Sequence, residues 1–195
     1  MEKLSNMKKT SATAASYKGV INHFNESGDQ IKWYFEQLPL LVKDFPYTVC
    51  LAYAFLKTEQ AQNRALYCGV VKLHGADGEV ADNAINKQHL TRDGFRLLYK
   101  NVFGHALNDS TSEKIKKAER VRDRVIHGKQ VSDPDMRQAI IDVIEYAKAL
   151  NKDLKAAAGF EPFGDLRGFK GRAQSLEKST TIWLLKGLGF TGGGN

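Results

Sequence analysis

Residues 132–154 contain the feature that most narrows the fold, which is a helix start followed by a long apolar stripe. Asp133 fits the N-cap, where a side-chain oxygen accepts from free backbone N–H groups, and Pro134 fits the first helical position. Apolar residues then recur at three- and four-residue spacing: Ile140, Val143, Ile144, Ala147, Leu150 and Leu154. We therefore expect a long core helix that ends near Gly159.

The rest of the chain repeats the helical period and shows no strand pattern of any length. Val49, Tyr53 and Leu56 fit that period, and Pro39 is expected to end or bend the helix before it. Residues 79–88 are polar and predict a loop with room for a short helix. Further helices are predicted over residues 29–38, 46–74, 90–103 and 111–127. The expected fold is an all-α helical bundle of about five to six helices with an irregular C-terminal segment.

The order of these segments predicts one main domain and an appendage. Residues 1–158 are expected to form the bundle, with residues 1–16 as a mobile basic arm. Residues 159–195 mix glycine, arginine and phenylalanine and include a short predicted helix over 174–186. This extension is expected to pack on the bundle, and the alternative is that its aromatic and basic residues 160–172 grip single-stranded RNA.

Composition limits the classes of function. The formal net charge of +7 favours an anionic partner such as nucleic acid. Cys50 and Cys68 have neither metal-ligand nor disulfide spacing, which favours the reducing cytoplasm. The lysine-containing N-terminus lacks the apolar core of a secretory signal, and no apolar run is long enough for a bilayer. The scattered histidines and the glycine pattern predict no metal and no cofactor.

Residues 119–128 carry the strongest chemical signal. Arg122 is followed by a polar acid, Asp123, and by His127 after three more residues, and Gly128 then stops the helix. Arg122 shares a helical face with apolar residues, which are Ile115, Ala118 and Val125. A guanidinium in that register is either a buried structural ion pair or part of a recessed anion site.

His127 lies about 140° from Arg122 around an ideal helix axis. The two side chains therefore do not stack within one straight helix. A histidine before a helix-stopping glycine is often a C-terminal cap. It also suits acid or base catalysis, because an ordinary histidine titrates near neutral pH. Unwinding at residues 127–128, or a second subunit, is needed to bring the pair together.

A second face of the same helix is basic. Lys117, Arg120, Arg124 and His127 follow helical spacing, and Lys129 comes just after the stop. Residues 113–130 hold seven Lys or Arg and three Asp or Glu, which leaves four net positive charges. The stripe is either a solvated face or an electrostatic track for an RNA backbone.

With these residues in place, the sequence over 112–159 resembles the HEPN domains (higher eukaryote and prokaryote nucleotide-binding). Arg122, Asp123 and His127 match their arginine–polar–three residues–histidine motif, in which asparagine is common at the Asp123 position. Lys129 stands where a subgroup of toxins has tyrosine. The resemblance implies a dimer with a composite cleft between two motif helices, and often a toxin or an antiviral effector.

The function that we expect is therefore metal-independent endoribonuclease activity. Arg122, Asp123 and His127 are the expected catalytic residues, and Lys117, Arg120, Arg124 and Lys129 the expected RNA-binding residues. RNA, a second copy of the chain and an antitoxin or regulatory protein are the expected partners. Two alternatives remain, which are a non-catalytic HEPN-like module that binds RNA, nucleotide or protein, and a helical adaptor whose motif is a coincidence.

Overall fold

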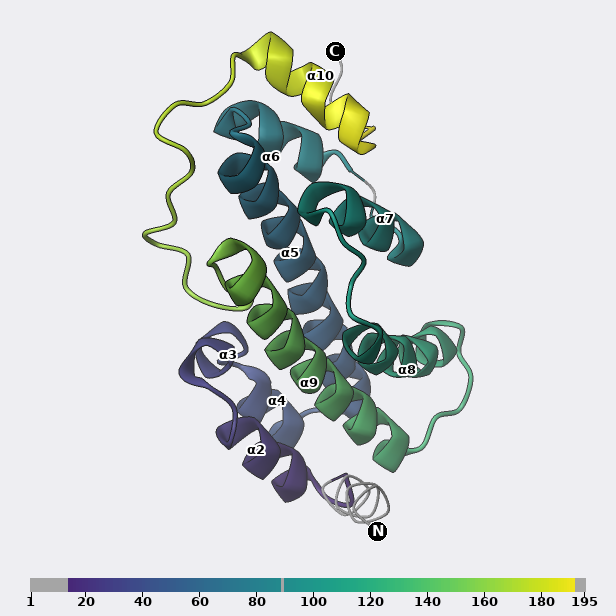
Figure 1. Cartoon of the computed structure of the whole chain (residues 1–195). Helices are drawn as coiled ribbons and strands as arrows, with labels where there is room; N and C mark the ends of the chain where they lie inside the picture. The colour runs from purple at the N-terminus through teal and green to yellow at the C-terminus, as the bar shows by residue number, and fades with distance from the viewer. Residues whose placement is uncertain (1–13, 89, 192–195) are drawn as a thin grey trace. The chain divides into compact units, whose positions relative to one another are not determined.

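The structure is a computed structural model that describes residues 14–88 and 90–191. Over these residues the chain is all-α, with nine helices and no strand, which confirms the expected fold class. The helices are α2 (Tyr17–Asn25), α3 (Asp29–Tyr34), α4 (Leu38–Asp44), α5 (Tyr47–His74), α6 (Gly78–Asn86), α7 (Arg92–Phe103), α8 (Asp109–Ile126), α9 (Asp133–Ala158) and α10 (Lys178–Leu188) (Figure 1). None of the described helices has the length and apolar content needed to cross a bilayer.

The described residues hold more helices than the five or six expected. Pro39 lies in the first turn of α4 instead of ending the helix before it, so the region before α5 divides into three short helices. The polar segment at 79–88 forms most of α6. Asp77 caps that helix by accepting from the Val80 N–H at 3.0 Å, and one face is buried by Ala81, Ala84 and Ile85.

The start of α9 differs from the prediction by one residue. The hydroxyl of Ser132 caps the helix by accepting from the Asp135 N–H at 3.3 Å, and Asp133 is already helical. The apolar stripe is buried throughout, as expected: Ile140, Val143, Ile144, Ala147, Leu150 and Leu154. The helix ends at Gly159, whose φ of +71° is the left-handed conformation that glycine adopts without strain.

The buried face of α5 differs from the face whose helical period predicted the helix, which is that of Val49, Tyr53 and Leu56. The predicted single helix is present with 28 residues. Val49 and Leu56 are 43% and 54% exposed, whereas Leu51 and Phe55 are buried. Because this part of the helix is apolar on nearly every side, its period predicts a helix without deciding which face meets the core.

The contacts divide the described chain into two compact units. Unit 1 comprises the described residues up to Thr58, Asp109–Leu150 and Phe163–Asp165. Unit 2 comprises Glu59–Asn108, Asn151–Pro162 and the described residues from Leu166 onward. The division falls within α5 and α9, whereas the sequence suggested one boundary after residue 158.

The aromatic core of unit 1 is centred on Phe163. Its ring is fully buried and lies 5.3 to 6.0 Å, centroid to centroid, from the rings of Tyr34, Phe35 and Tyr146. The first part of the chain is also tied into this unit. The guanidinium of Arg137 donates to the carbonyls of Ala14 and Ala15, so residues 14–16 are not a free arm, and residues 1–13 lie outside the described residues.

Unit 2 holds most of the C-terminal segment. Helix α10 packs on α6 and α7. The guanidinium of Arg172 donates to the Lys72 and Leu73 carbonyls, and the Leu176 N–H donates to the Gly75 carbonyl at 2.7 Å. The irregular stretch before α10 is therefore fastened to the C-terminal end of α5 by backbone carbonyls that a helix end leaves without helical partners.

An ion-paired carboxylate joins α2 to α9 in unit 1. His23 Nε2 lies 3.0 Å and Lys148 Nζ lies 2.7 Å from the same oxygen of Glu145. The hydrogen bond from His23, followed by that from Lys148, lowers the pKa of Glu145 from 4.5 to about 2 although partial burial acts in the opposite direction.

We expect Glu145→Gln to lower the free energy of unfolding by about 1–2 kcal/mol at neutral pH. Because the folded pKa lies below the unfolded one, this stabilisation is present above pH 4.5 and lost as the pH falls toward 2. Urea unfolding of the wild type and the variant across that range measures it. Glu113→Gln removes the solvent-accessible pair with Lys116 and is the control, with little change expected. Parallel acid profiles of wild type and Glu145→Gln would contradict the account.

Candidate functional site

Helix α8 carries every residue of the predicted site except His127 and Lys129, which follow it. It begins at Asp109, two residues before the expected start. Its buried face consists of Thr111, Ser112, Ile115, Ala118 and Glu119. This face packs into unit 1 and fixes the direction of the other faces, because successive residues are turned by a constant angle around the helix axis.

The end of α8 is a glycine turn. Gly128 has a φ of +67°, its N–H donates to the Val125 carbonyl at 3.0 Å, and the Lys129 N–H donates to the Arg124 carbonyl at 2.9 Å. These two bonds form the Schellman motif, which closes a helix through a left-handed residue. His127 is the exposed residue just before that glycine, so the turn holds its backbone while its ring is open to solvent.

Arg122 is held by a carboxylate and by an aromatic ring of its own chain. Its Nη2 and Nε lie 3.1 and 3.3 Å from Asp123 Oδ1. Its guanidinium carbon lies 4.6 Å from the centre of the Phe55 ring on α5. The side chains of Arg122 and Asp123 are 26% and 41% exposed, so the pair is recessed and still within reach of solvent. The sequence left Arg122 as either a structural ion pair or part of an anion site. The structure contains an ion pair, between Arg122 and the adjacent Asp123.

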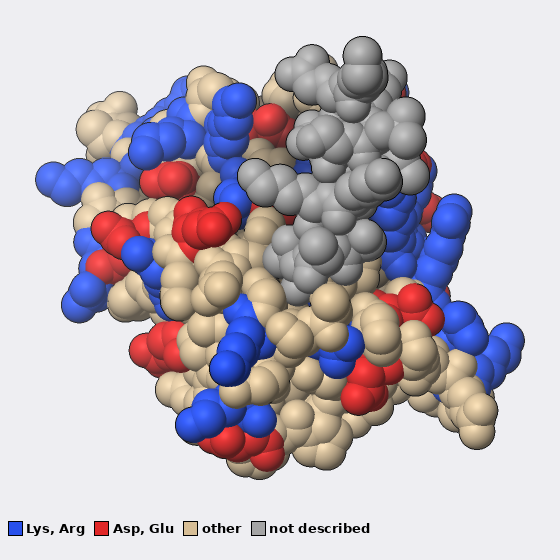
Figure 2. All heavy atoms as spheres, turned by 90° about the horizontal axis from the view of Figure 1, so that it is seen from below, with Lys and Arg blue, Asp and Glu red and all other residues tan. Residues whose placement is uncertain are grey.

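The basic stripe faces solvent along its whole length. Lys117, Arg120, Arg124 and His127 are all exposed, as is Lys129 after the turn. Arg124 also donates to the Gln130 carbonyl at 2.8 Å, so one cation of the stripe fastens the turn. In the face shown by Figure 2, Asp and Glu side chains lie between the Lys and Arg side chains. The positive charge on that face therefore does not form one continuous patch.

The structure does not bring Arg122 and His127 together in one chain. The helix is regular through Ile126, so the two side chains keep the separation of about 140° that an ideal helix gives them. Among the described residues none hydrogen-bonds to the His127 ring. Unwinding at residues 127–128, one of the two possibilities left open by the sequence, is limited to the single left-handed glycine, which leaves the imidazole exposed at the helix end.

One residue of this site was missed in the sequence. Phe55 forms the platform for the Arg122 guanidinium, and a cation over an aromatic face gains about 0.5–2 kcal/mol. Phe55 is 4% exposed and belongs to the face of α5 that the helical period could not single out. The signal in the sequence was an arginine on the apolar face of its helix. Such an arginine needs a partner on which its planar guanidinium can stack, such as an aromatic ring.

Metal-ligand groups and reactive thiols were also sought among the described residues. Within residues 14–88 and 90–191, no three His, Cys, Asp or Glu side chains are grouped so that they could hold a metal ion. Both cysteines are buried, and burial raises the pKa of Cys50 to about 11 and that of Cys68 to about 12. Thiols with so high a pKa are poor nucleophiles near neutral pH.

Comparison of the chain with protein-family models, with curated proteins and with solved structures finds no match.

Replacement of the turn glycine tests how His127 is presented. A Cβ at Gly128 would meet no atom within 4 Å, so Gly128→Ala should cost only the left-handed backbone strain, about 1–2 kcal/mol of unfolding free energy. Gly168→Ala is the control, because its Cβ also meets open space and its φ is not positive. Urea unfolding compares the two. Equal stability of both variants would show that α8 does not end in this turn.

Proposed function

We propose that this chain is a metal-independent endoribonuclease of the HEPN type, which acts as a homodimer in the cytoplasm. The observation that carries the proposal is the end of α8. There an exposed His127 follows a basic solvent-facing stripe, and a recessed arginine is oriented by Asp123 and Phe55. An oriented guanidinium, an exposed imidazole and a cationic surface are the groups that cleavage of an RNA phosphodiester requires.

The proposed site is shared by two subunits. Arg122 and His127 of one chain point in directions about 140° apart, so they do not converge on one phosphate. A two-fold axis beside the end of α8 would pair the guanidinium of each subunit with the imidazole of the other. Ile126, next to His127, is 68% exposed and would be covered by such an interface.

The proposed reaction is transesterification of the RNA phosphodiester by the neighbouring 2′-OH, followed by release of the two RNA fragments. One imidazole takes the proton of a ribose 2′-OH, and that oxygen bonds to the adjacent phosphorus. The bond from phosphorus to the 5′-oxygen breaks, and the same imidazole, now protonated, gives the leaving oxygen its proton. Arg122 would stabilise the negative charge on the phosphorane-like transition state. The products are a 2′,3′-cyclic phosphate end and a 5′-hydroxyl end, so the step is balanced without a metal ion.

Each remaining site residue has a supporting role in the proposal. Asp123 orients Arg122 through the hydrogen bonds already described. Lys117, Arg120, Arg124 and Lys129 bind the phosphate backbone from exposed positions. A cytoplasmic ribonuclease of this kind must be restrained, so we also include in the proposal a toxin or antiviral role with an antitoxin or regulatory partner.

One observation favours a second candidate, a non-catalytic module that binds RNA. Arg122 is already paired with Asp123 and packed on Phe55 in a single chain, so it has a structural role without any substrate. In that case Arg122→Ala destabilises unit 1, and there is no cleavage to lose. The experiment below separates the two candidates.

The test is cleavage of a mixed RNA substrate in EDTA by the wild type, His127→Ala and His105→Ala, purified in parallel. His105 is an exposed histidine of unit 2 and is the matched control. We expect His127→Ala to lower the rate by at least roughly 100-fold without unfolding, because general acid–base catalysis contributes that much. His105→Ala should retain the wild-type rate and yield the same cyclic phosphate ends.

Full cleavage by His127→Ala would reject the catalytic role. Absence of cleavage by the wild type, together with retained RNA binding, would favour the non-catalytic module.

A further inference from the structure

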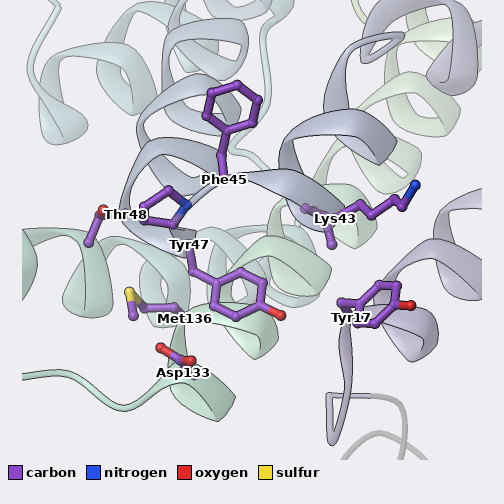
Figure 3. Close-up of a pocket in the computed structure, with 9 residues that line it drawn as sticks. Tyr17, Lys43, Phe45, Tyr47, Thr48, Asp133 and Met136 are labelled. Carbon is purple, nitrogen blue, oxygen red and sulfur yellow. The ribbon is translucent and has the colours of Figure 1, made fainter.

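A pocket of about 440 Å³ lies in unit 1 at the place where four helix ends meet. It is bordered by the first residue of α2, the end of α4, and the first turns of α5 and α9. Its lining combines aromatic rings with one cation and one carboxylate, and includes Tyr17, Lys43, Phe45, Tyr47, Asp133 and Met136. Figure 3 shows the rings of Tyr47 and Tyr17 across the hollow from one another, with Asp133 and Met136 on the Tyr47 side and Lys43 on the Tyr17 side.

We infer that this pocket binds an unstacked nucleobase of single-stranded RNA. The inference takes RNA as the ligand from the proposed function and adds the subsite that would set its preference for single strands. Four further observations support it, which concern the aromatic wall, a buried charge beside it, the polar groups in the lining, and the position of the pocket along the chain.

The aromatic wall is held in place and partly open. Tyr17 and Phe45 are 37% and 48% exposed, so both rings are accessible to a ligand. The Tyr47 ring is half-buried and carries the guanidinium of Arg137 over one face, 5.1 Å from the ring centre. Bases stack on such rings in single-strand binding proteins, and a ring that is already fixed loses little entropy when a base arrives.

Arg137 also supplies a positive charge that no acid among the described residues neutralises. The residue is only 8% exposed. Its Nε and Nη2 donate to the carbonyls of Ala14 and Ala15 at 2.6 and 3.0 Å, so its hydrogen bonds are made to neutral groups. Among the described residues no carboxylate lies within 4.0 Å of its guanidinium, although Asp133 is one helical turn away on α9. A buried positive charge without an acid favours an anionic ligand next to it.

The polar lining matches the two ends of a nucleotide. Lys43 is exposed at the pocket edge, where its ammonium group can bind a phosphate as a point charge. Asp133 is an acceptor that suits the amino group of cytosine, and the Thr48 hydroxyl is both donor and acceptor. The combination favours a base carrying an amino group over a purely apolar guest.

The pocket lies close along the chain to the proposed site of cleavage. Asp133 follows His127 by six residues, so their Cα atoms are at most about 22 Å apart. The turn between them carries Lys129, and both residues belong to unit 1. A single strand whose phosphate is at His127 would therefore reach the pocket within a few nucleotides.

The test measures binding separately from cleavage. A six-nucleotide fluorescent RNA is titrated into full-length His127→Ala, which leaves the RNA intact if the proposed function holds, and into the same chain with Tyr47→Leu added. Leucine keeps apolar cover over Arg137 and removes the ring. We expect the Kd to rise about 10-fold, since stacking of one base on an aromatic side chain is worth roughly that much. Tyr67→Leu, a half-buried tyrosine of α5 in unit 2, is the matched control and should leave the Kd unchanged.

A second measurement locates the base. An abasic nucleotide is placed at each position of the hexamer in turn. One position should weaken binding to the His127→Ala chain and have no further effect once Tyr47 is replaced. A blunt RNA duplex should bind both chains equally, because its bases remain stacked.

The inference is overturned if Tyr47→Leu leaves the Kd unchanged, if duplex and single strand weaken together, or if no abasic position depends on Tyr47. Cleavage by the wild type with any of these outcomes would reject the pocket and keep the proposed function. The expected binding pattern without wild-type cleavage would keep the pocket and reject the nuclease.

Discussion

Four residues of regular α-helix lie between Arg122 and His127, and this spacing governs how the site in unit 1 has to work. A rotation of about 100° per residue turns the two side chains away from one another, so neither can be moved toward the other without breaking backbone hydrogen bonds. The fold uses both directions. The arginine side faces Phe55 of α5, and the neighbouring Asp123 of α8 also holds the guanidinium. The histidine side faces solvent at a glycine turn.

The same constraint explains why the cationic surface takes the form of a stripe. Lys117, Arg120 and Arg124 are among the exposed side chains of α8, at the spacing that repeats on one face. Positive charge along that face leads to His127 and ends at Lys129, four residues before α9 begins at Asp133. The pocket near Tyr47 follows that turn along the chain, so unit 1 contains a basic stripe, an exposed histidine and an aromatic pocket.

The features that could be predicted from the sequence are those that depend on the residues of a single helix. The buried stripe of α9, the length of α5 and the glycine that ends α8 all follow from period and end signals. Features that need a partner helix were not predictable. The buried face of α5 is set by what packs against it, because residues 49–56 are apolar nearly all round. The short helix α6 is stabilised by burial of Ala81, Ala84 and Ile85, and this burial could not be predicted because the segment is mostly polar. The Phe55 platform and the pocket join side chains from separate helices, and the spacing within any one of them could not reveal either.

The central claim is that Arg122 of one subunit works with His127 of another. Its most direct test mixes two inactive variants, Arg122→Ala and His127→Ala, after joint unfolding and refolding, and measures RNA cleavage in EDTA. Random pairing makes half of the dimers mixed, and each mixed dimer has one intact pair out of two, so the account predicts recovery of roughly a quarter of the wild-type rate. A mixture that stays silent while the wild type cleaves would contradict it.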